Sequence, residues 1–123
     1  METVEKKNTE ITEEVKPTPE KEIENPNFVP FKKPLTFEGK KYDGLDMDLD
    51  SLTGADIETA EVQFVSEDPS NAAQTPLKEM SKGFQAILAA KAAKVNVALI
   101  RSLSASDYAK VTTKVQVFLL TQD

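Results

Sequence analysis

Apolar residues change their spacing midway along this chain, and that change limits the folds it can adopt. Between residues 35 and 50, hydrophobic and polar residues alternate, which is the period of a half-buried β-strand. From residue 53 onward the hydrophobic residues recur every three or four positions, as in an amphipathic helix. The pattern predicts an α+β domain in which a short N-terminal β-hairpin is followed by three to four helices.

The predicted hairpin occupies the first part of the alternating segment. Leu35 and Phe37 alternate with polar residues, Gly39-Lys40 supplies the turn, and Tyr42 begins the returning strand. Residues 45–50 alternate again and predict a further half-buried strand. Its apolar members are Leu45, Met47 and Leu49, and its acidic members are Asp46, Asp48 and Asp50.

Two predicted helix starts share one arrangement. Thr53 and Asp56, and likewise Ser104 and Asp107, are a hydroxyl residue and an aspartate three positions later. The hydroxyl at the N-cap accepts a hydrogen bond from a free backbone amide, and the aspartate can reach back toward the cap. Both pairs predict where a helix begins, at residues 53 and 104.

The remaining helices are predicted from proline placement and apolar spacing. One helix is expected to begin at Thr75, with Pro76 in its first turn, after a loop over residues 66–74. Residues 97–100 predict a brief helix. The expected core faces are Ile57, Ala60 and Phe64, then Leu77, Met80, Phe84, Ile87 and Leu88, and finally Tyr108, Val111, Val115, Phe118 and Leu119.

The first thirty residues differ in composition from the rest. They hold four of the seven prolines and eight acidic residues. Such a segment buries too little apolar surface to offset the entropy of ordering it. We predict a disordered tail over residues 1–30 and one small domain over residues 31–123, with Phe28, Val29 and Phe31 marking where the chain first contacts the fold.

The amino-acid composition argues against several classes of function. The chain has no Cys and no His, so thiol chemistry and the commonest general base and metal ligand are missing. A net charge of −6 argues against nucleic-acid binding, which needs clustered Lys and Arg. No apolar run is long enough to cross a membrane. We expect no enzyme activity, no catalytic residues, no cofactor and a cytoplasmic location.

The three aspartates of residues 45–50 suggest a calcium loop that the following residues do not complete. Asp46, Asp48 and Asp50 fit positions one, three and five of an EF-hand, but Ser51 stands where Gly is required and Ile57 where Glu is required. We therefore predict no metal site. A metal- or ligand-binding module built on this segment stays as an alternative.

Charge is distributed unevenly along the chain. Residues 38–68 contain ten acids and two lysines, whereas residues 76–123 contain seven bases and three acids. We expect the two parts to neutralise each other within the fold. The alternative is that one charged face meets a partner.

Some apolar residues fall outside the expected core faces. At 100° per residue, four alanines lie opposite the large apolar residues of their helix: Ala86, Ala89, Ala90 and Ala93. They either stabilise an exposed helix, since alanine is the best helix former, or let another backbone from the fold or a partner approach closely. The predicted partner-binding residues are Ala89, Ala90 and Ala93 on this helix, and Val117 and Leu120 on the last one.

Five segments together resemble the tail assembly chaperones of long-tailed bacteriophages. They are residues 34–42 (PLTFEGKKY), 49–57 (LDSLTGADI), 84–95 (FQAILAAKAAKV), 103–108 (LSASDY) and 115–119 (VQVFL). The resemblance implies a chaperone that acts in the host cytoplasm, binds the tape measure protein, helps to recruit tail tube subunits and is absent from the mature virion. Self-association is a further expectation. The alternative is a structural tail component that stays in the particle.

Overall fold

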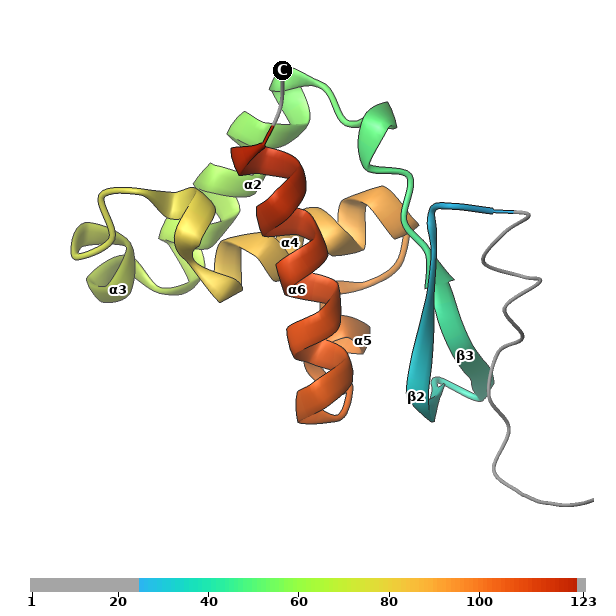
Figure 1. The fold of residues 1–123 in the computed structure, drawn as a ribbon. Helices are drawn as coiled ribbons and strands as arrows, with labels where there is room; N and C mark the ends of the chain where they lie inside the picture. Colours follow the sequence, from blue (N-terminus) through green and yellow to red (C-terminus); the bar gives the residue numbers. More distant parts are fainter. Residues whose placement is uncertain (1–24, 122–123) are drawn as a thin grey trace, which may run out of the picture.

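The computed structural model describes residues 25–121, which form a β-hairpin followed by five α-helices (Figure 1). This confirms the predicted α+β class. The strands are β2 (Phe28–Phe37) and β3 (Lys40–Asp46); the α-helices are α2 (Gly54–Glu67), α3 (Pro69–Ala73), α4 (Lys82–Ala93), α5 (Val97–Arg101) and α6 (Ala105–Leu120); and two short 3₁₀ helices are η1 (Leu49–Ser51) and η2 (Lys78–Met80).

The chain first contacts the core at the start of β2. Residues 1–24 of the expected disordered tail lie outside the described residues. Phe28 and Pro30, however, already belong to β2, and Val29 between them is buried in the core. The expectation that the chain first contacts the fold at Phe28, Val29 and Phe31 is therefore confirmed, because β2 supplies buried side chains from Val29 onward.

The hairpin is confirmed, but its turn is one residue earlier than predicted. Phe37 pairs with Lys40, so the turn residues are Glu38 and Gly39. Their φ values are 50° and 79°. Two positive φ angles are typical of a type I′ turn, whose twist matches that of the flanking strands. Gly39 adopts its angle without a steric penalty. A turn at Gly39-Lys40 would instead force a lysine into the left-handed region.

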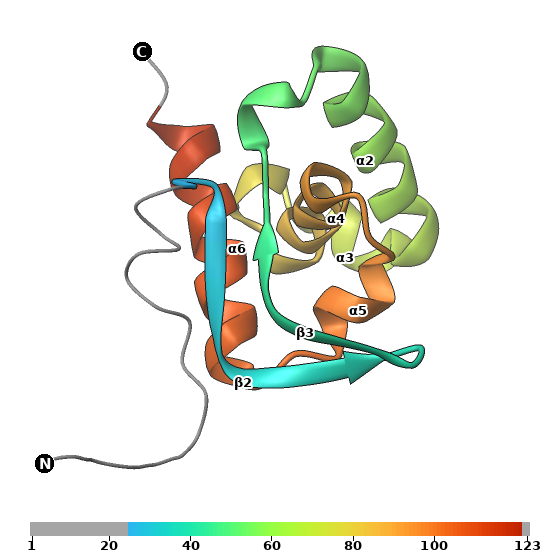
Figure 2. The ribbon, with the colours of Figure 1, turned by 90° about the vertical axis from the view of Figure 1, so that its right-hand side faces the viewer.

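A single buried carboxylate fixes the bend of β2. The pairing with β3 is irregular between Pro30 and Leu35, and Figure 2 shows β2 changing direction about midway. At this point the backbone amides of Lys32 and Lys33 donate to the two carboxylate oxygens of Asp107, at 2.8 and 2.9 Å. The side chain of Asp107, on α6, therefore satisfies strand amides that the bend turns away from β3.

The alternation over residues 45–50 is confirmed in burial but only partly as a strand. Leu45, Met47 and Leu49 are buried, and the aspartates between them are exposed. The strand ends at Asp46, and η1 follows. The amide of Asp48 donates to the carbonyl of Ala92 at the end of α4, at 3.3 Å, which draws the chain off β2 and onto that helix.

Both predicted helix starts are confirmed. The Thr53 hydroxyl accepts from the Asp56 amide at 3.2 Å, and the Asp56 carboxylate accepts from the Thr53 amide at 2.9 Å, completing a capping box. The Thr53 hydroxyl also donates to the Asp56 carboxylate, at 3.1 Å. The bond from the Thr53 amide and then the bond from its hydroxyl lower the pKa of Asp56. Ser104 likewise accepts from the Asp107 amide at 3.3 Å. There the carboxylate accepts from the Ser104 hydroxyl and from two backbone amides of β2.

α4 is the centre of the domain. It packs against α2, α5 and α6 and also contacts η1, η2 and β3. Figure 2, in which α4 is seen nearly end-on, shows it between α2, α5 and α6. Its Phe84 meets Phe64 of α2 edge to face, with ring centroids 6.3 Å apart. Residues on every side of α4 are buried, so this helix has no solvent face along most of its length. They are Phe84, Gln85, Ala86, Ile87, Leu88, Ala89, Ala90 and Ala92.

The segment before α4 differs from the prediction. α4 begins at Lys82, not Thr75, and η2 precedes it. The side-chain amide of Gln85 donates to the Glu79 carbonyl at 2.6 Å, so this segment folds back along α4 instead of continuing its axis. The predicted loop over residues 66–74 is also wrong in part, because Asp68 caps α3 and Pro69 takes its first position.

Candidate protein-interaction surface

The alanines predicted to border a partner lie inside the fold. Ala89 is fully buried, Ala90 is 5% exposed, and Ala93 packs partly buried against the core. The expectation of an exposed alanine face is therefore wrong, because α4 is enclosed by α2, α5 and α6. The small side chains of the alanines let α2, α5 and α6 approach α4 closely. This agrees with the alternative from the sequence in which another backbone of the same fold packs against the alanines.

Val117 and Leu120 do lie on the surface, at 52% and 51% exposure. They project from the side of α6 opposite Val111 and Val115, which are completely buried. The expectation that these two residues sit away from the core face is thus confirmed. Whether a partner covers them stays a prediction.

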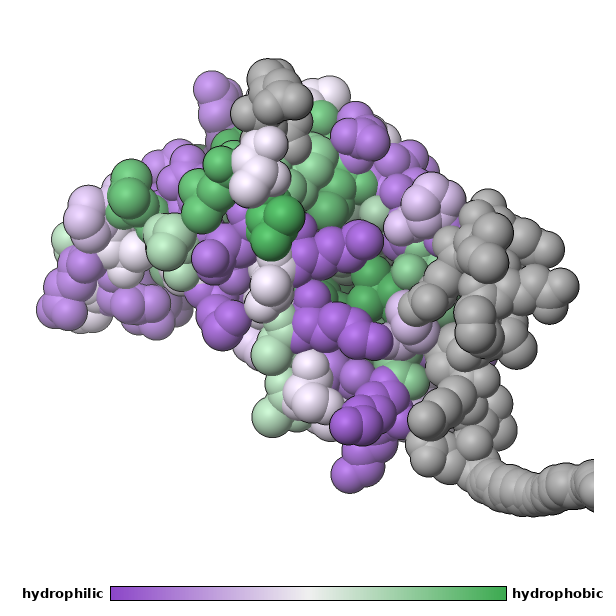
Figure 3. Space-filling model, viewed as in Figure 1, coloured by the Kyte–Doolittle hydropathy of each residue, from purple (hydrophilic) through white to green (hydrophobic). Residues whose placement is uncertain are grey.

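Two further exposed apolar residues come from the segment beside α6. Leu77 is 64% exposed and Met80 is 51% exposed. Their expected place on a core face is therefore wrong, because both precede α4, which begins at Lys82. η2 contacts α6, and Gln85 joins them by donating to the Glu79 carbonyl and, at 2.9 Å, to the Gln116 side chain. Figure 3 shows hydrophobic side chains gathered over the C-terminal half of α6 and the elements beside it. We call Leu77, Met80, Val117 and Leu120 the η2–α6 patch.

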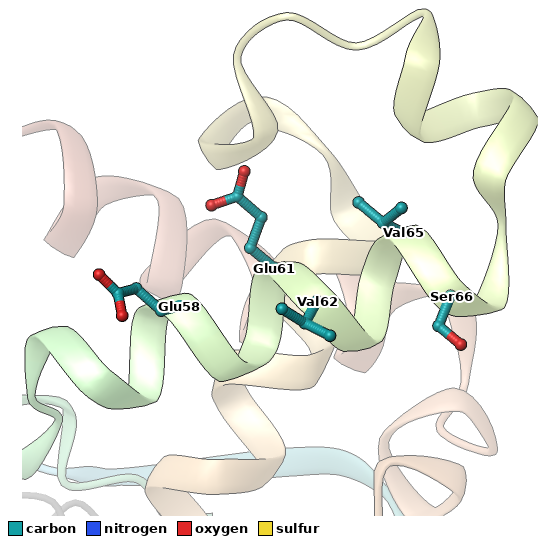
Figure 4. Close-up of a pocket in the computed structure, with 5 residues that line it drawn as sticks. All are labelled: Glu58, Glu61, Val62, Val65 and Ser66. Atoms are coloured by element: carbon teal, nitrogen blue, oxygen red, sulfur yellow. The ribbon is translucent and has the colours of Figure 1, made fainter.

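α2 carries a second exposed apolar group, which the sequence analysis missed. Val62 is 70% exposed and Val65 is 41% exposed. With Glu58, Glu61 and Ser66 they line a shallow hollow of about 570 Å³ on one side of the helix (Figure 4). The signal was present, since both valines lie off the stripe of Ile57, Ala60 and Phe64. We call Glu58, Glu61, Val62 and Val65 the α2 face.

Among residues 25–121, two ion pairs join the acidic part of the chain to the basic part. Arg101 approaches Glu67 at 2.7 Å, and Lys78 approaches Glu61 at 3.8 Å. The hydrogen bond from Arg101, followed by one from Gln63, lowers the pKa of Glu67. These contacts agree with the predicted neutralisation within the fold. Both pairs lie at the surface, where their contribution to stability is about 0–1 kcal/mol each.

The buried polar groups hold elements together. Asp107 is 1% exposed and Thr112 is fully buried. Besides the two β2 amides, the Asp107 carboxylate accepts from the Ser104 hydroxyl at 3.0 Å. The Thr112 hydroxyl donates to the Tyr108 carbonyl at 2.9 Å and accepts from the Lys82 ammonium at 3.1 Å. Both side chains therefore have structural partners that explain their burial.

Within residues 25–121 no group of three or more acidic side chains is placed to hold a metal ion. In the same range no helix combines the length and apolar character needed to cross a bilayer. The exposed apolar residues of α2, η2 and α6 are therefore the surface features that most need a functional explanation.

Comparisons of the chain with protein-family models, with curated proteins and with solved structures found no match. The resemblance to phage tail assembly chaperones accordingly rests on the sequence segments alone.

Proposed function

We propose that this protein is a non-enzymatic phage tail assembly chaperone that binds the tape measure protein and helps to recruit tail tube subunits. The class comes from the five sequence segments. The location of the client-binding site is proposed from one observation, the η2–α6 patch. Its four large apolar side chains are each at least half exposed. Exposed apolar groups gathered on adjoining elements are typical of interaction sites.

The chemistry of the patch suits a helical client. η2 and the end of α6 lie side by side, so an amphipathic helix crossing both can place apolar residues at helical spacing against them. Fully burying one large aliphatic side chain is worth about 1.5–3 kcal/mol. Because the four residues are already about half covered, one contact is weak. Many copies bound along one long client would together hold it firmly.

The test is co-purification with the tape measure protein after expression in the same cell. Met80→Glu and Leu120→Glu each place a charge in the patch, and we expect each to reduce the recovered client severalfold. Ala98→Glu is the matched control, because Ala98 is exposed on α5 and undergoes the same change of charge. Thermal unfolding of all three variants should stay close to wild type.

Client recovery that is unchanged in the Met80→Glu, Leu120→Glu double variant would remove the patch as the binding site. Analysis of purified phage particles distinguishes the chaperone from the alternative, a structural tail component. A chaperone is missing from purified phage, whereas a tail component remains in it.

A further inference from the structure

One exposed side of α6 combines apolar and positively charged side chains. Lys110, Lys114, Val117 and Leu120 follow one another at helical spacing, and we call them the α6 face. The one acid of α6, Asp107, is buried and bonded to β2. Lys114 forms no ion pair within residues 25–121. The two exposed apolar side chains of this face therefore lie beside positive charge that no acid of α6 offsets.

The chain enters the domain next to the α6 face. The Lys110 ammonium donates to the Pro30 carbonyl of β2 at 2.6 Å. The first half of β2 runs alongside α6 (Figure 2), and the two elements are in contact. Residues 1–24, which precede β2 in the sequence, are therefore joined to the domain beside this face.

The sequence of residues 10–15 (EITEEV) is complementary to the α6 face. It holds three glutamates, two aliphatic residues and no base. Ile11 and Val15 are four positions apart, so they lie on one side of the segment whether its backbone is helical or extended. An acidic segment with two aliphatic side chains thus matches a basic surface with two aliphatic side chains.

The connecting chain is long enough for these two parts to meet. The ten residues that follow Val15, up to Asn25, can span about 33–36 Å when extended. α6 has 16 residues and is about 24 Å long. Because β2 already contacts α6, all of this helix is within reach. We propose that residues 10–15 dock on the α6 face of the same molecule.

Charge selects the α6 face over the other exposed apolar surface. Docked there, Ile11 and Val15 cover Val117 and Leu120, and the glutamates of the segment lie near the lysines of α6. The α2 face has two exposed valines as well, but α2 carries four acids and no base. An acidic segment is therefore repelled from the α2 face.

The contact is weak in itself and is strengthened by its connection to the domain. Two aliphatic pairs bury little surface, and exposed charges are screened beyond about 8 Å at physiological ionic strength. A short connection, however, holds the segment near the α6 face at a millimolar effective concentration. A contact with a dissociation constant of about 1 mM is then formed in about half of the molecules. The docked fraction should fall as salt is added and stay the same on dilution.

Docking of residues 10–15 regulates the proposed binding site. Val117 and Leu120 belong both to the α6 face and to the η2–α6 patch, so the segment must leave before a client helix can cover the patch. This consequence rests on the proposed function. The docking itself does not, because it needs only the purified protein.

The experiment places a nitroxide spin label beside the segment in the full chain. Because the chain has no Cys, Thr9→Cys provides a single labelling site. The label weakens the NMR signals of backbone amides that come close to it. We expect the signals of Val117 and Leu120 to lose at least about half of their intensity, and those of the α2 face to keep theirs.

Ile11→Ser, Val15→Ser with the same label is the matched control. It keeps the charge and the length of the connecting chain and removes only the apolar contact, so the signals of α6 should recover. They should also recover in Lys114→Glu, which places a negative charge on the α6 face. Circular dichroism verifies that each variant is folded.

A loss of α6 signal that is equal in the labelled wild type and in Ile11→Ser, Val15→Ser overturns the proposal. So does a loss that arises only when the label is on one chain and the observed amides are on another, because a second copy then supplies the segment.

Client binding provides a separate measurement. Release of the segment in Ile11→Ser, Val15→Ser should raise the recovery of the tape measure protein severalfold. If client recovery is unchanged in every variant of the patch and of the segment, the proposed function fails, whereas the spin-label measurement still decides the docking.

Discussion

Asp56 and Asp107 occupy equivalent positions at the starts of α2 and α6, yet their side chains have different hydrogen-bond partners. Each lies three residues after the hydroxyl that caps its helix. The Asp56 carboxylate bonds back to Thr53 at the surface, whereas the Asp107 carboxylate is buried and receives two amides of β2. The sequence predicted the cap in both cases. It did not predict the contact between Asp107 and residues 74 and 75 positions away.

Replacing Asp107 with Asn should therefore destabilise the protein much more than replacing Asp56. Asn supplies one acceptor oxygen where two amides and a hydroxyl need a charged carboxylate. We expect Asp107→Asn to lower the free energy of unfolding by about 2–4 kcal/mol, measured by urea denaturation.

Asp56→Asn is the matched control, and we expect it to destabilise the protein much less, because the Asp56 carboxylate lies at the surface and bonds only within its own capping box. Equal losses in the two variants would mean that the bonds from Asp107 to β2 contribute nothing to stability.

At the scale of elements, predictions succeeded where the element depends on residues close together in the sequence, and failed where it depends on contacts between distant residues. The helix starts and the hairpin depend on neighbouring residues and were predictable. The helix expected from Thr75 was not formed, because apolar spacing permits a helix without requiring it. The bond from Gln85 to the Glu79 carbonyl holds the segment against α4, and a second bond from Gln85 to Gln116 joins it to α6. α3 was missed because Asp68-Pro69 both ends one helix and begins the next.

The turn of the hairpin offers an element-level prediction. Glu38 has a φ of 50°, which is unfavourable for a glutamate, whereas Asn adopts such angles readily. Glu38→Asn should raise the free energy of unfolding by about 0.5–1 kcal/mol, measured as a higher melting temperature.

Lys40→Asn serves as the comparison for the turn, because Lys40 is exposed and begins β3 directly after it. That variant should be neutral or slightly destabilising, since Asn is unfavourable in strands. A Glu38→Asn protein that melts below wild type would contradict the assigned turn.

At the scale of the whole molecule, the position of α4 explains why part of the candidate site was wrong. Projection of a helix assumes that one side faces solvent. α4 is surrounded by other elements, so its alanines indicate close packing of these elements and not a solvent-exposed surface. On α6 the same projection succeeded, because that helix lies at the edge and keeps an outward side. Leu77 and Met80, before α4, were predicted to be buried and are exposed, because the segment that carries them does not continue the axis of α4.

Ala89→Glu tests this placement. Ala89 is fully buried, so a glutamate there must bury a charge without a partner or break the packing of α4. We expect a loss of about 3 kcal/mol or more in the free energy of unfolding, measured in urea. Ala98→Glu on α5 should change it by less than about 0.5 kcal/mol. A fully folded Ala89→Glu protein of normal stability would contradict the central position of α4.

The enclosure of α4 also has a consequence for how this protein can diverge over evolutionary time. A substitution in α4 disturbs several neighbouring elements at once and requires matching changes in each. A substitution on the outward sides of α2 or α6 disturbs none of them. Descendants of a common ancestor can therefore exchange one set of partners for another while the interior stays the same. Distant relatives of this chain should share small side chains along α4 and differ most at Val62, Lys114 and Leu120.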